Sequence, residues 1–394
     1  MAVSRLFIKS TADSAQPSPP PPASIHRLAP PQTASAQRTD PLAVPQIMTA
    51  ARINQLGPPQ IIVLERIDVP EPQELQVLVR VYAAGVGPWD ALVRTGKSGL
   101  PLTPPLTLGA EISGIVERVG PNTTGFAPGD EVFGATSPLF IMGYAEYALA
   151  SVRMIAKKPA ALSHIEAAAL PVVGVMAWQM LFDHAAARDG QTVVIHGGAG
   201  NVGAYAVQLA RAKNLHVIAT VRNGGADYVR GLGAHEVIDL ETDTLTNFAR
   251  RADAVIDTVG GPAQDQLFAL VKPGGIIVSS VSRPDLRLAQ KRRVRADYFI
   301  VDVNTSQLTR LAEMHDNNEL VIPVGSVLPL GEVRAAHEML GGTRAHRRGK
   351  IRIRNREGLR NAACDCCNAL GRAYWPAERL KGGNEPTDSQ SSVC

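Results

Sequence analysis

Cysteine is nearly absent from this sequence of 394 residues. The four cysteines lie close to the C-terminus, at Cys364, Cys366, Cys367 and Cys394. Residues 1–363 therefore form neither a disulfide nor a thiolate–zinc bond. This absence suits a reducing compartment and removes the usual soft zinc ligands from most of the chain. The tail cysteines lack the spacing of a zinc ribbon or knuckle, and no histidine follows them, so we expect no metal there.

Long apolar runs and a large excess of charge are missing as well. No apolar stretch approaches the roughly 18 residues that a membrane helix needs, so we expect no membrane partner. The formal net charge of +4 is small for this length and does not indicate a nucleic-acid partner. The 45% of hydrophobic residues is enough to bury sizeable cores, and the length predicts two domains plus tails.

The two ends differ in composition from the rest of the chain. Residues 1–47 are rich in proline, serine, alanine and glutamine, so they are predicted to be a disordered extension. Their opening carries Arg5 and Lys9 among apolar residues, which is one feature of a cleavable transit peptide. The alternative is an uncleaved tail or an over-extended gene start. We therefore expect a cytoplasmic protein, or a mitochondrial one if the segment is cleaved; residues 356–394 are predicted to be an irregular tail.

Short strands fill the first folded region, residues 48–172. Residues 76–82 alternate between apolar and polar side chains, as a half-buried strand does. Apolar runs at 111–119 and 131–134 follow, with glycine and proline clusters between them. This pattern is typical of a compact barrel-like domain.

The pattern of apolar and polar residues changes in residues 173–298. A helical stretch at 177–187 precedes residues 192–196, an apolar run without polar alternation that indicates a strand buried on both faces. Helical and strand patterns then alternate, which predicts an α/β fold with a doubly wound parallel sheet. Residues 299–355 show a mixed pattern.

A glycine-rich hexapeptide follows the buried strand and opens a helix. It consists of Gly198, Ala199, Gly200, Asn201, Val202 and Gly203, which fits G-x-G-x-x-G. In this context Gly198 is predicted to allow the tight turn, Gly200 the close approach of a pyrophosphate, and Gly203 close helix–strand packing. The alternative is a plain glycine turn in a sheet.

The end of the second strand indicates which dinucleotide binds. A site for NAD normally has an acidic residue there, which accepts hydrogen bonds from the ribose 2′-hydroxyl. This chain has Arg222 instead, and a guanidinium suits the 2′-phosphate of NADPH. The alternative is that Arg222 is a solvated loop residue.

Several motifs, together with their order along the chain, resemble the medium-chain dehydrogenase/reductase superfamily, in particular its zinc-free quinone oxidoreductase-like branch. They are Gly129–Gly134, Gly143–Tyr147, His196–Ala210, Ile256–Gly261, Pro273–Gly275 and Arg348–Ile351. The resemblance implies a GroES-like β-barrel domain built from residues 48–172 and 299–355. It implies that a Rossmann domain, residues 173–298, is inserted between these two parts and binds NADPH. Val259 and Arg348 are further candidates for that site, and the alternative for Arg348 is a solvated surface residue.

The chain departs from its apparent relatives at metal and substrate positions. Zinc-dependent members carry a cysteine in the loop after an early strand and a histidine in a G-H-E triplet. Here residues 85–90 read GVGPWD and residues 109–111 read GAE, so neither position supplies a ligand and no metal is expected. Zinc-free members often carry an asparagine ahead of Asp90 in this loop, which is lost here. They also often carry a threonine where this chain has Met176.

These observations predict an NADPH-dependent oxidoreductase that transfers hydride to a quinone or an α,β-unsaturated carbonyl compound. Tyr144 is the candidate hydrogen-bond donor to the substrate, unless it is only a packed residue, and Trp89 is a candidate wall of the substrate site. Asp90 is a further catalytic candidate, although a structural ion pair between Asp90 and Arg94 is the favoured interpretation. His196 is interpreted as a packed or cofactor-adjacent residue.

Other classes of function are weighed against this one. A sensor or RNA-binding protein that holds NADPH with little turnover is the alternative, because basic residues cluster at 291–295 and 344–350. No aromatic residues are interleaved with them, so nucleic acid is not the expected partner. A small carbonyl-conjugated substrate is expected, and a homodimer is left open.

Overall fold

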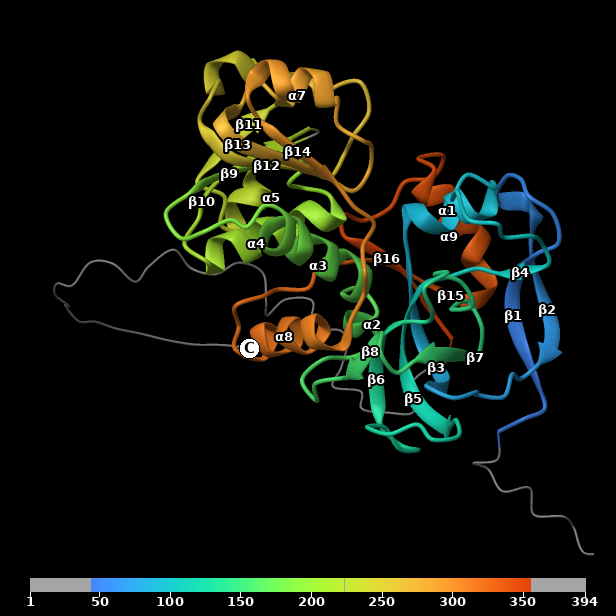
Figure 1. Ribbon diagram of the computed structural model, residues 1–394. Helices are drawn as coiled ribbons and strands as arrows, with labels where there is room; N and C mark the ends of the chain where they lie inside the picture. The colour runs from blue at the N-terminus through green and yellow to red at the C-terminus, as the bar shows by residue number, and fades with distance from the viewer. Residues whose placement is uncertain (1–43, 223, 356–394) are drawn as a thin grey trace, which may run out of the picture. The chain divides into compact units, whose positions relative to one another are not determined.

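The computed structural model describes residues 44–222 and 224–355 (Figure 1). The extension predicted for residues 1–47 lies outside this part except for its last four residues, and the tail predicted for 356–394, with all the cysteines, lies outside it entirely. The first strand begins at Ile47.

Two sheets form from the first part of the chain and its return. A three-stranded sheet has the order β2-β1-β4, and a seven-stranded sheet has the order β15-β16-β3-β5-β6-β8, with β7 also paired to β3. The strands are β1 (Ile47–Ile53), β2 (Ile62–Asp68), β3 (Gln76–Val86), β4 (Leu106–Thr107), β5 (Glu111–Val119), β6 (Glu131–Ala135), β7 (Tyr147–Ser151), β8 (Ile155–Lys157), β15 (Val324–Pro329) and β16 (Lys350–Arg354). Alternate residues of β3 and β5, such as Val79 and Ile112, pack into one core with β16. These sheets form the GroES-like domain.

A six-stranded sheet forms from the middle of the chain. Its order is β11-β10-β9-β12-β13-β14, and every neighbouring pair is parallel. The strands are β9 (Thr192–His196), β10 (His216–Val221), β11 (Glu236–Asp239), β12 (Ala252–Asp257), β13 (Val271–Ser279) and β14 (Arg295–Tyr298). This is the Rossmann strand order, in which the first three strands run outward from β9 to one edge of the sheet and the last three run from β12 to the other edge.

Helices cover both faces of the parallel sheet. Val193 and Ile195 pack with α4 in one core, whereas Val194 packs in a second core with Ala289 of α7. Figure 1 shows α4 and α7 on opposite sides of these strands. The α-helices are α1 (Pro88–Arg94), α2 (His164–Ala167), α3 (Pro171–Trp178), α4 (Asn201–Ala212), α5 (Ala226–Gly231), α6 (Gln264–Leu267), α7 (Leu286–Arg292), α8 (Thr305–Asp316) and α9 (Val333–Leu340).

Shorter helical segments complete the described secondary structure. A π-helix, η2 (Gln179–His184), continues α3, and the 3₁₀ turns are η1 (Pro59–Ile61), η3 (Leu245–Phe248) and η4 (Leu330–Glu332).

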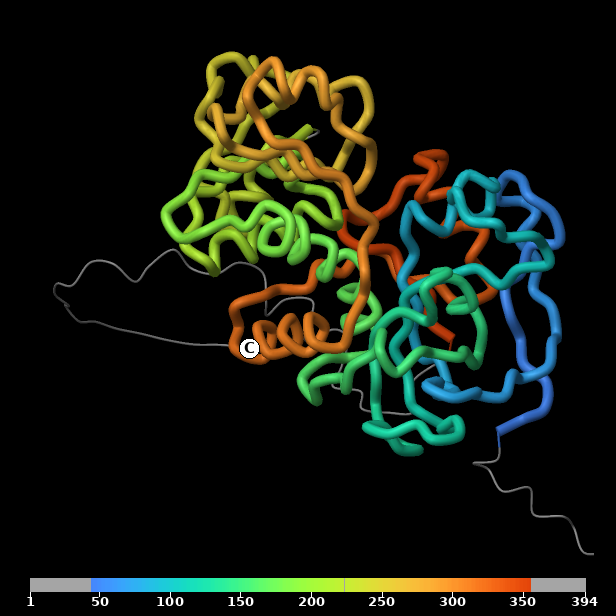
Figure 2. Tube along the Cα trace, in the orientation of Figure 1, coloured from blue at the N-terminus to red at the C-terminus, as the bar shows by residue number. Residues whose placement is uncertain are grey.

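The chain returns to its first domain after the Rossmann sheet. β16 pairs antiparallel with β3, and β15 pairs parallel with β16. The trace in Figure 2 shows the red segment of β16 beside the early strands. The insertion of a Rossmann sheet into a GroES-like domain is therefore confirmed, whereas the exact domain boundaries stay predictions.

Most predicted elements match the observed ones closely. The run at 111–119 is β5, and the run at 192–196 is β9. The helical stretch at 177–187 is the end of α3 followed by the π-helix. β14 was not predicted, because its sequence, RADY, has no apolar run.

Candidate active site

A glycine turn joins β9 to α4. Gly197 has a φ of +80°, which lies in the left-handed region, whereas Gly198 is not in that region. The prediction that Gly198 allows the tight turn is therefore wrong, and Gly197 has this role. Gly198 is instead restricted by packing, because a Cβ there would lie 2.9 Å from the Cβ of Ala219.

The other two glycines of the turn differ in their surroundings. A Cβ on Gly203 would lie 2.1 Å from the carbonyl oxygen of Gly197, so α4 approaches the turn too closely for any side chain. A Cβ on Gly200 would have one atom within 4 Å, the carbonyl oxygen of Gly197, at 3.2 Å. The space beside Gly200 is therefore open, as the approach of a ligand to the backbone would require.

A cavity of about 370 Å³ lies at this turn. Its lining includes five predicted cofactor-binding residues: Gly200, Asn201, Val202, Arg222 and Val259. It also includes Pro88 of the GroES-like domain and His196, which was interpreted as a packed or cofactor-adjacent residue, together with Thr220 and Thr258, which the sequence did not single out. The first amides of α4 have no carbonyl one turn earlier to accept their hydrogen bonds, so they favour an anion. The lining thus fits the phosphates of a dinucleotide.

The two arginines predicted to bind the cofactor have different surroundings. Arg222 lines the cavity with an exposed side chain, and it forms no ion pair with any residue in the described ranges. Arg348 does not line the cavity; its guanidinium carbon lies 5.0 Å from the ring centre of Tyr228 in α5. Arg348, in the segment before β16, therefore contacts the Rossmann domain through Tyr228.

Buried Asp257 shapes the loop that carries Val259. Its Oδ1 accepts hydrogen bonds from the backbone N–H groups of Val259 (3.1 Å) and Gly260 (2.9 Å). Its Oδ2 accepts from Gln264 (2.8 Å) and Ser279 (3.1 Å). The side chain of Val259 is 52% exposed at the cavity, which leaves an apolar surface there for a ligand.

The structure places the catalytic candidates Tyr144 and Asp90 in contact with each other, but in the protein interior. The Tyr144 hydroxyl donates to Asp90 Oδ2 at 2.8 Å, and both side chains are buried. The backbone N–H of Gly87 donates to the same oxygen at 2.8 Å. Burial raises the pKa of Asp90 to about 6, against the lowering effect of these hydrogen bonds and of the nearby Lys350 ammonium. Neither side chain lines the cavity, so their catalytic roles stay predictions.

The expected ion pair between Asp90 and Arg94 is wrong. Nε and Nη1 of Arg94 are buried and have no hydrogen-bond partner within residues 44–222 and 224–355. Asp90 and Arg94 lie one turn apart on α1, but the carboxylate turns back to cap the start of the helix at Gly87. This capping bond fixes the loop before Trp89.

Trp89 lies between the two cores of the protein. It packs against both the Rossmann core and the GroES-like core, and its ring meets Phe140 edge to face at 5.9 Å. Its neighbour Pro88 lines the cavity. Trp89 therefore stands next to the cavity, where the prediction of a substrate wall remains untested.

A buried ion pair occupies the region of the zinc-ligand positions. The Lys350 ammonium pairs with Glu111 Oε2, and Glu111 Oε1 accepts from the N–H of Val172 at 2.9 Å. A Cβ on Gly87 would lie 3.1 Å from the Lys350 nitrogen, and Ala110 replaces the histidine of the triplet. The fixed ammonium of Lys350 repels a second cation, and neither Gly87 nor Ala110 has a side chain that can bind a metal. This region therefore does not fit zinc. Within the described ranges no three His, Cys, Asp or Glu side chains are grouped to hold a metal.

Met176 accepts a hydrogen bond on its sulfur. The hydroxyl of Ser280 donates to Met176 Sδ at 3.1 Å, and Ser280 follows the last residue of β13. A thioether therefore stands where many apparent relatives have a hydroxyl, and its local partner is Ser280.

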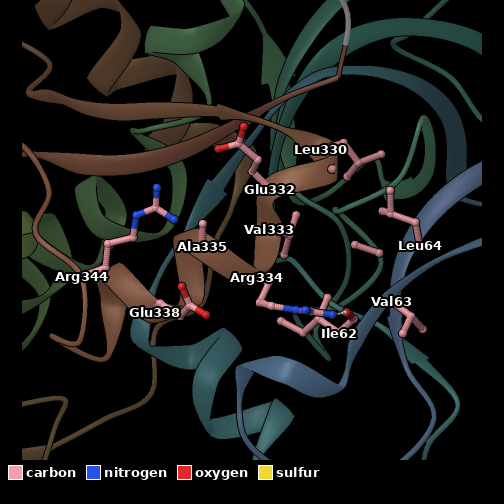
Figure 3. Close-up of a pocket in the computed structure, with 12 residues that line it drawn as sticks. Ile62, Val63, Leu64, Leu330, Glu332, Val333, Arg334, Ala335, Glu338 and Arg344 are labelled. Atoms are coloured by element: carbon pink, nitrogen blue, oxygen red, sulfur yellow. Dashed lines mark hydrogen bonds between the residues drawn. The ribbon is translucent and has the colours of Figure 1, made fainter.

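A larger cavity of about 610 Å³ lies within the GroES-like domain. Figure 3 shows Val63 and Leu64 on one side of it and residues of α9 and η4 on the other. Arg334, whose Nη2 donates to the carbonyl of Ile62 at 3.2 Å, faces it together with Glu338 and Arg344. It lacks a glycine turn and has acidic as well as basic side chains, so it does not fit a dinucleotide phosphate.

No helix in the part of the chain that the structure describes is both long and apolar enough to cross a bilayer.

Comparisons with known proteins agree with the fold. Residues 73–160 match the alcohol dehydrogenase GroES-like domain, and residues 232–351 match the family described as zinc-binding dehydrogenase. The chain is 31% identical to the quinone oxidoreductase of Homo sapiens over 273 residues, 65% of this chain and 82% of that protein. It is 29% identical over 260 residues to a protein of Arthroderma benhamiae named probable zinc-binding oxidoreductase, mitochondrial, covering 62% of this chain and 78% of that protein.

A solved structure shows the same likeness. The quinone oxidoreductase from Coxiella burnetii superimposes with a TM-score of 0.72 at 33% identity, covering 79% of this chain and 100% of that one. The chain therefore belongs to the medium-chain dehydrogenase/reductase superfamily of oxidoreductases, and within it to the quinone oxidoreductase-like proteins.

Proposed function

We propose that the protein is an NADPH-dependent reductase that transfers hydride to a quinone or an α,β-unsaturated carbonyl compound without zinc. The observation that carries this proposal is the cavity at the glycine turn, where Arg222 is exposed at the end of β10. Among the residues that the structure describes, Arg222 has no ion-pair partner and the cavity lining has no acidic residue. A carboxylate there would repel a 2′-phosphate, whereas a guanidinium attracts it.

Each side chain of the site has a proposed task. The amides at the start of α4 would hold the pyrophosphate, and Arg222, with Arg348 as a second cation, would hold the 2′-phosphate. Pro88 and Trp89 would orient a planar substrate from the GroES-like side. Bound NADPH would supply the hydride. The apolar side chains of Val259 and Val173 in the cavity lining would help to exclude water.

Zinc independence is supported by the chemistry of the residues present. Gly87 and Ala110 offer no ligand, and the buried Lys350 ammonium already neutralises Glu111. We propose that turnover persists after prolonged dialysis against a chelator. Location in the cytoplasm or the mitochondrion, and assembly as a homodimer, stay predictions.

A turnover assay with a paired variant tests the proposal. NADPH consumption is measured against quinones, enones and alkenals, with NADH in parallel. Gly200→Val should abolish both NADPH binding and turnover, because its side chain would fill the open side of the turn. Gly231→Val is the matched control, since a Cβ there meets nothing within 4 Å and the residue is exposed.

The outcomes separate the proposal from its alternatives. Turnover with NADPH that is lost in Gly200→Val and kept in Gly231→Val supports it. Tight NADPH binding without turnover on the whole substrate panel would favour a sensor. A folded Gly200→Val protein with normal NADPH affinity would overturn the dinucleotide site.

A further inference from the structure

Three polar side chains stand in one row across the end of the Rossmann sheet. In the strand register His196 of β9 lies opposite Thr220 of β10 on one side and Asp257 of β12 on the other. All three are buried, with His196 only 3% exposed. His196 and Thr220 also line the cavity at the glycine turn. The row therefore lies directly beneath the proposed phosphate site.

The hydrogen bond between Thr220 and His196 bears on which ring nitrogen of His196 carries the proton. Thr220 Oγ1 accepts a hydrogen bond from the Gly197 N–H at 3.1 Å and lies 2.8 Å from His196 Nδ1. The Thr220 hydroxyl has a single proton, and the only acceptor within its reach in the described residues is Nδ1. We take Nδ1 as the acceptor, because the opposite arrangement would leave the Thr220 hydroxyl proton without an acceptor in the described residues, and the proton of the neutral ring is then on Nε2.

With this tautomer, the Nε2–H group of His196 has no hydrogen-bond partner in the part of the chain that the structure describes. Nε2 is buried without any hydrogen-bond acceptor in residues 44–222 and 224–355. The nearest carboxylate, Asp257, already accepts four hydrogen bonds from Val259, Gly260, Gln264 and Ser279. A buried donor without an acceptor costs free energy, so its presence at a cavity wall indicates a ligand acceptor.

We propose that His196 Nε2–H donates a hydrogen bond to a phosphate oxygen of the bound dinucleotide, with Thr220 holding the ring in the required tautomer. This inference rests on the proposed function, because it assumes that the cavity binds a dinucleotide. His196 then acts as a neutral donor beside the cationic Arg222.

The surrounding charges agree with a neutral ring. Burial lowers the pKa of His196, Asp257 raises it and Arg222 lowers it, and the net effect is downward. The donor is therefore present at neutral pH without a change of protonation.

Equilibrium binding of NADPH and NADH, followed by fluorescence, tests the role of the donor without any turnover. His196→Phe keeps a planar ring and removes both nitrogens, and it should weaken binding about 10- to 100-fold, as loss of a hydrogen bond to a charged group predicts. His196→Gln places an amide N–H near the position of Nε2 and should restore part of the affinity. Melting temperatures establish that both variants are folded.

The two cofactors locate the accepting phosphate. Equal losses for NADPH and NADH in His196→Phe assign the donor to the pyrophosphate, and a loss for NADPH alone assigns it to the 2′-phosphate; either result supports the proposal. Unchanged affinity for both cofactors in a folded His196→Phe protein overturns it.

The wild-type protein gives a second measurement that does not depend on the folding of a variant. Nitrogen NMR of the histidine rings should show the proton of His196 on Nε2 and a shift of that resonance when NADPH binds. A proton on Nδ1, or a resonance unmoved at saturation, would overturn the proposal while the dinucleotide site stands. A wild-type protein that binds neither cofactor would instead remove the proposed function itself.

Discussion

Replacement of Asp90 by asparagine should change how the stability of the protein depends on pH. Asp90 is 2% exposed, and burial raises its pKa from the ordinary 3.8 to about 6. The folded state therefore holds the proton more tightly than the unfolded state. Stability from this group is fully present below pH 3.8 and is lost as the pH rises through about 6.

The magnitude follows from the two pKa values. At about 1.4 kcal/mol for each pH unit, the separation between 3.8 and about 6 amounts to about 3 kcal/mol in total. Part of this loss already occurs below pH 5. Between pH 5 and pH 8 the wild type should lose about 1 to 2 kcal/mol relative to Asp90→Asn, which has no charge to bury.

Other buried groups make the wild-type curve alone uninformative. Burial lowers the pKa of His337 to about 3 and that of His164 to about 4, so stability from these rings is lost as the pH falls below 6.5. Their effect runs opposite to that of Asp90. The difference between wild type and variant removes their contribution, because both proteins contain the same histidines.

Urea unfolding at pH 5, 6, 7 and 8 measures this difference. Asp130→Asn is the control, because a hydrogen bond from the Ala127 N–H holds the pKa of Asp130 below its usual value. Its contribution is nearly complete above about pH 5, so its difference curve should be almost flat in this range. An Asp90→Asn difference that is equally flat would refute the assignment of a raised pKa to the buried carboxyl.

Two further predictions concern charged groups at the site and in the core. Arg222→Ala should weaken NADPH binding about 10- to 100-fold and leave NADH binding nearly unchanged, as loss of a charge-assisted hydrogen bond requires. The control is Arg230→Ala, because Arg230 is an exposed arginine on α5. Equal losses of affinity for both cofactors in Arg222→Ala would contradict NADPH selectivity. Lys350→Met should lower the free energy of unfolding by about 3 to 5 kcal/mol, because it leaves Glu111 charged and buried. Lys272→Met, which breaks a half-exposed pair with Asp253, should cost about 1 kcal/mol or less in the same urea titration.

Local pattern and chemistry within the sequence were sufficient for the fold class and the glycine turn. An apolar run without alternation marks β9 as a strand covered on both faces, and the glycines after it mark the entry to α4. Both signals depend on residues close in sequence, because strand burial and helix entry are local properties of the chain. Arg222 was found in the same way, at a fixed place after the second strand.

The turn also shows where local pattern fails. Gly197 and Gly198 are both glycines, so the hexapeptide fits with either one taking the left-handed conformation. The choice is made by tertiary contact: Ala219 of the neighbouring strand crowds Gly198, while Gly197 turns the chain at a φ of +80°.

The polar interior was decided by tertiary structure alone. Lys350 pairs with Glu111 because the chain returns through β16 to pair with β3. Asp90 bonds to Tyr144, which is distant in sequence, and not to Arg94 on its own helix, because the fold brings Tyr144 beside it. Thr220, His196 and Asp257 form a row only through the register of three parallel strands. Burial raises the pKa of Asp90 and leaves Nε2 of His196 without a hydrogen-bond partner among the described residues. Burial is a property of the packed molecule, which no window of sequence contains.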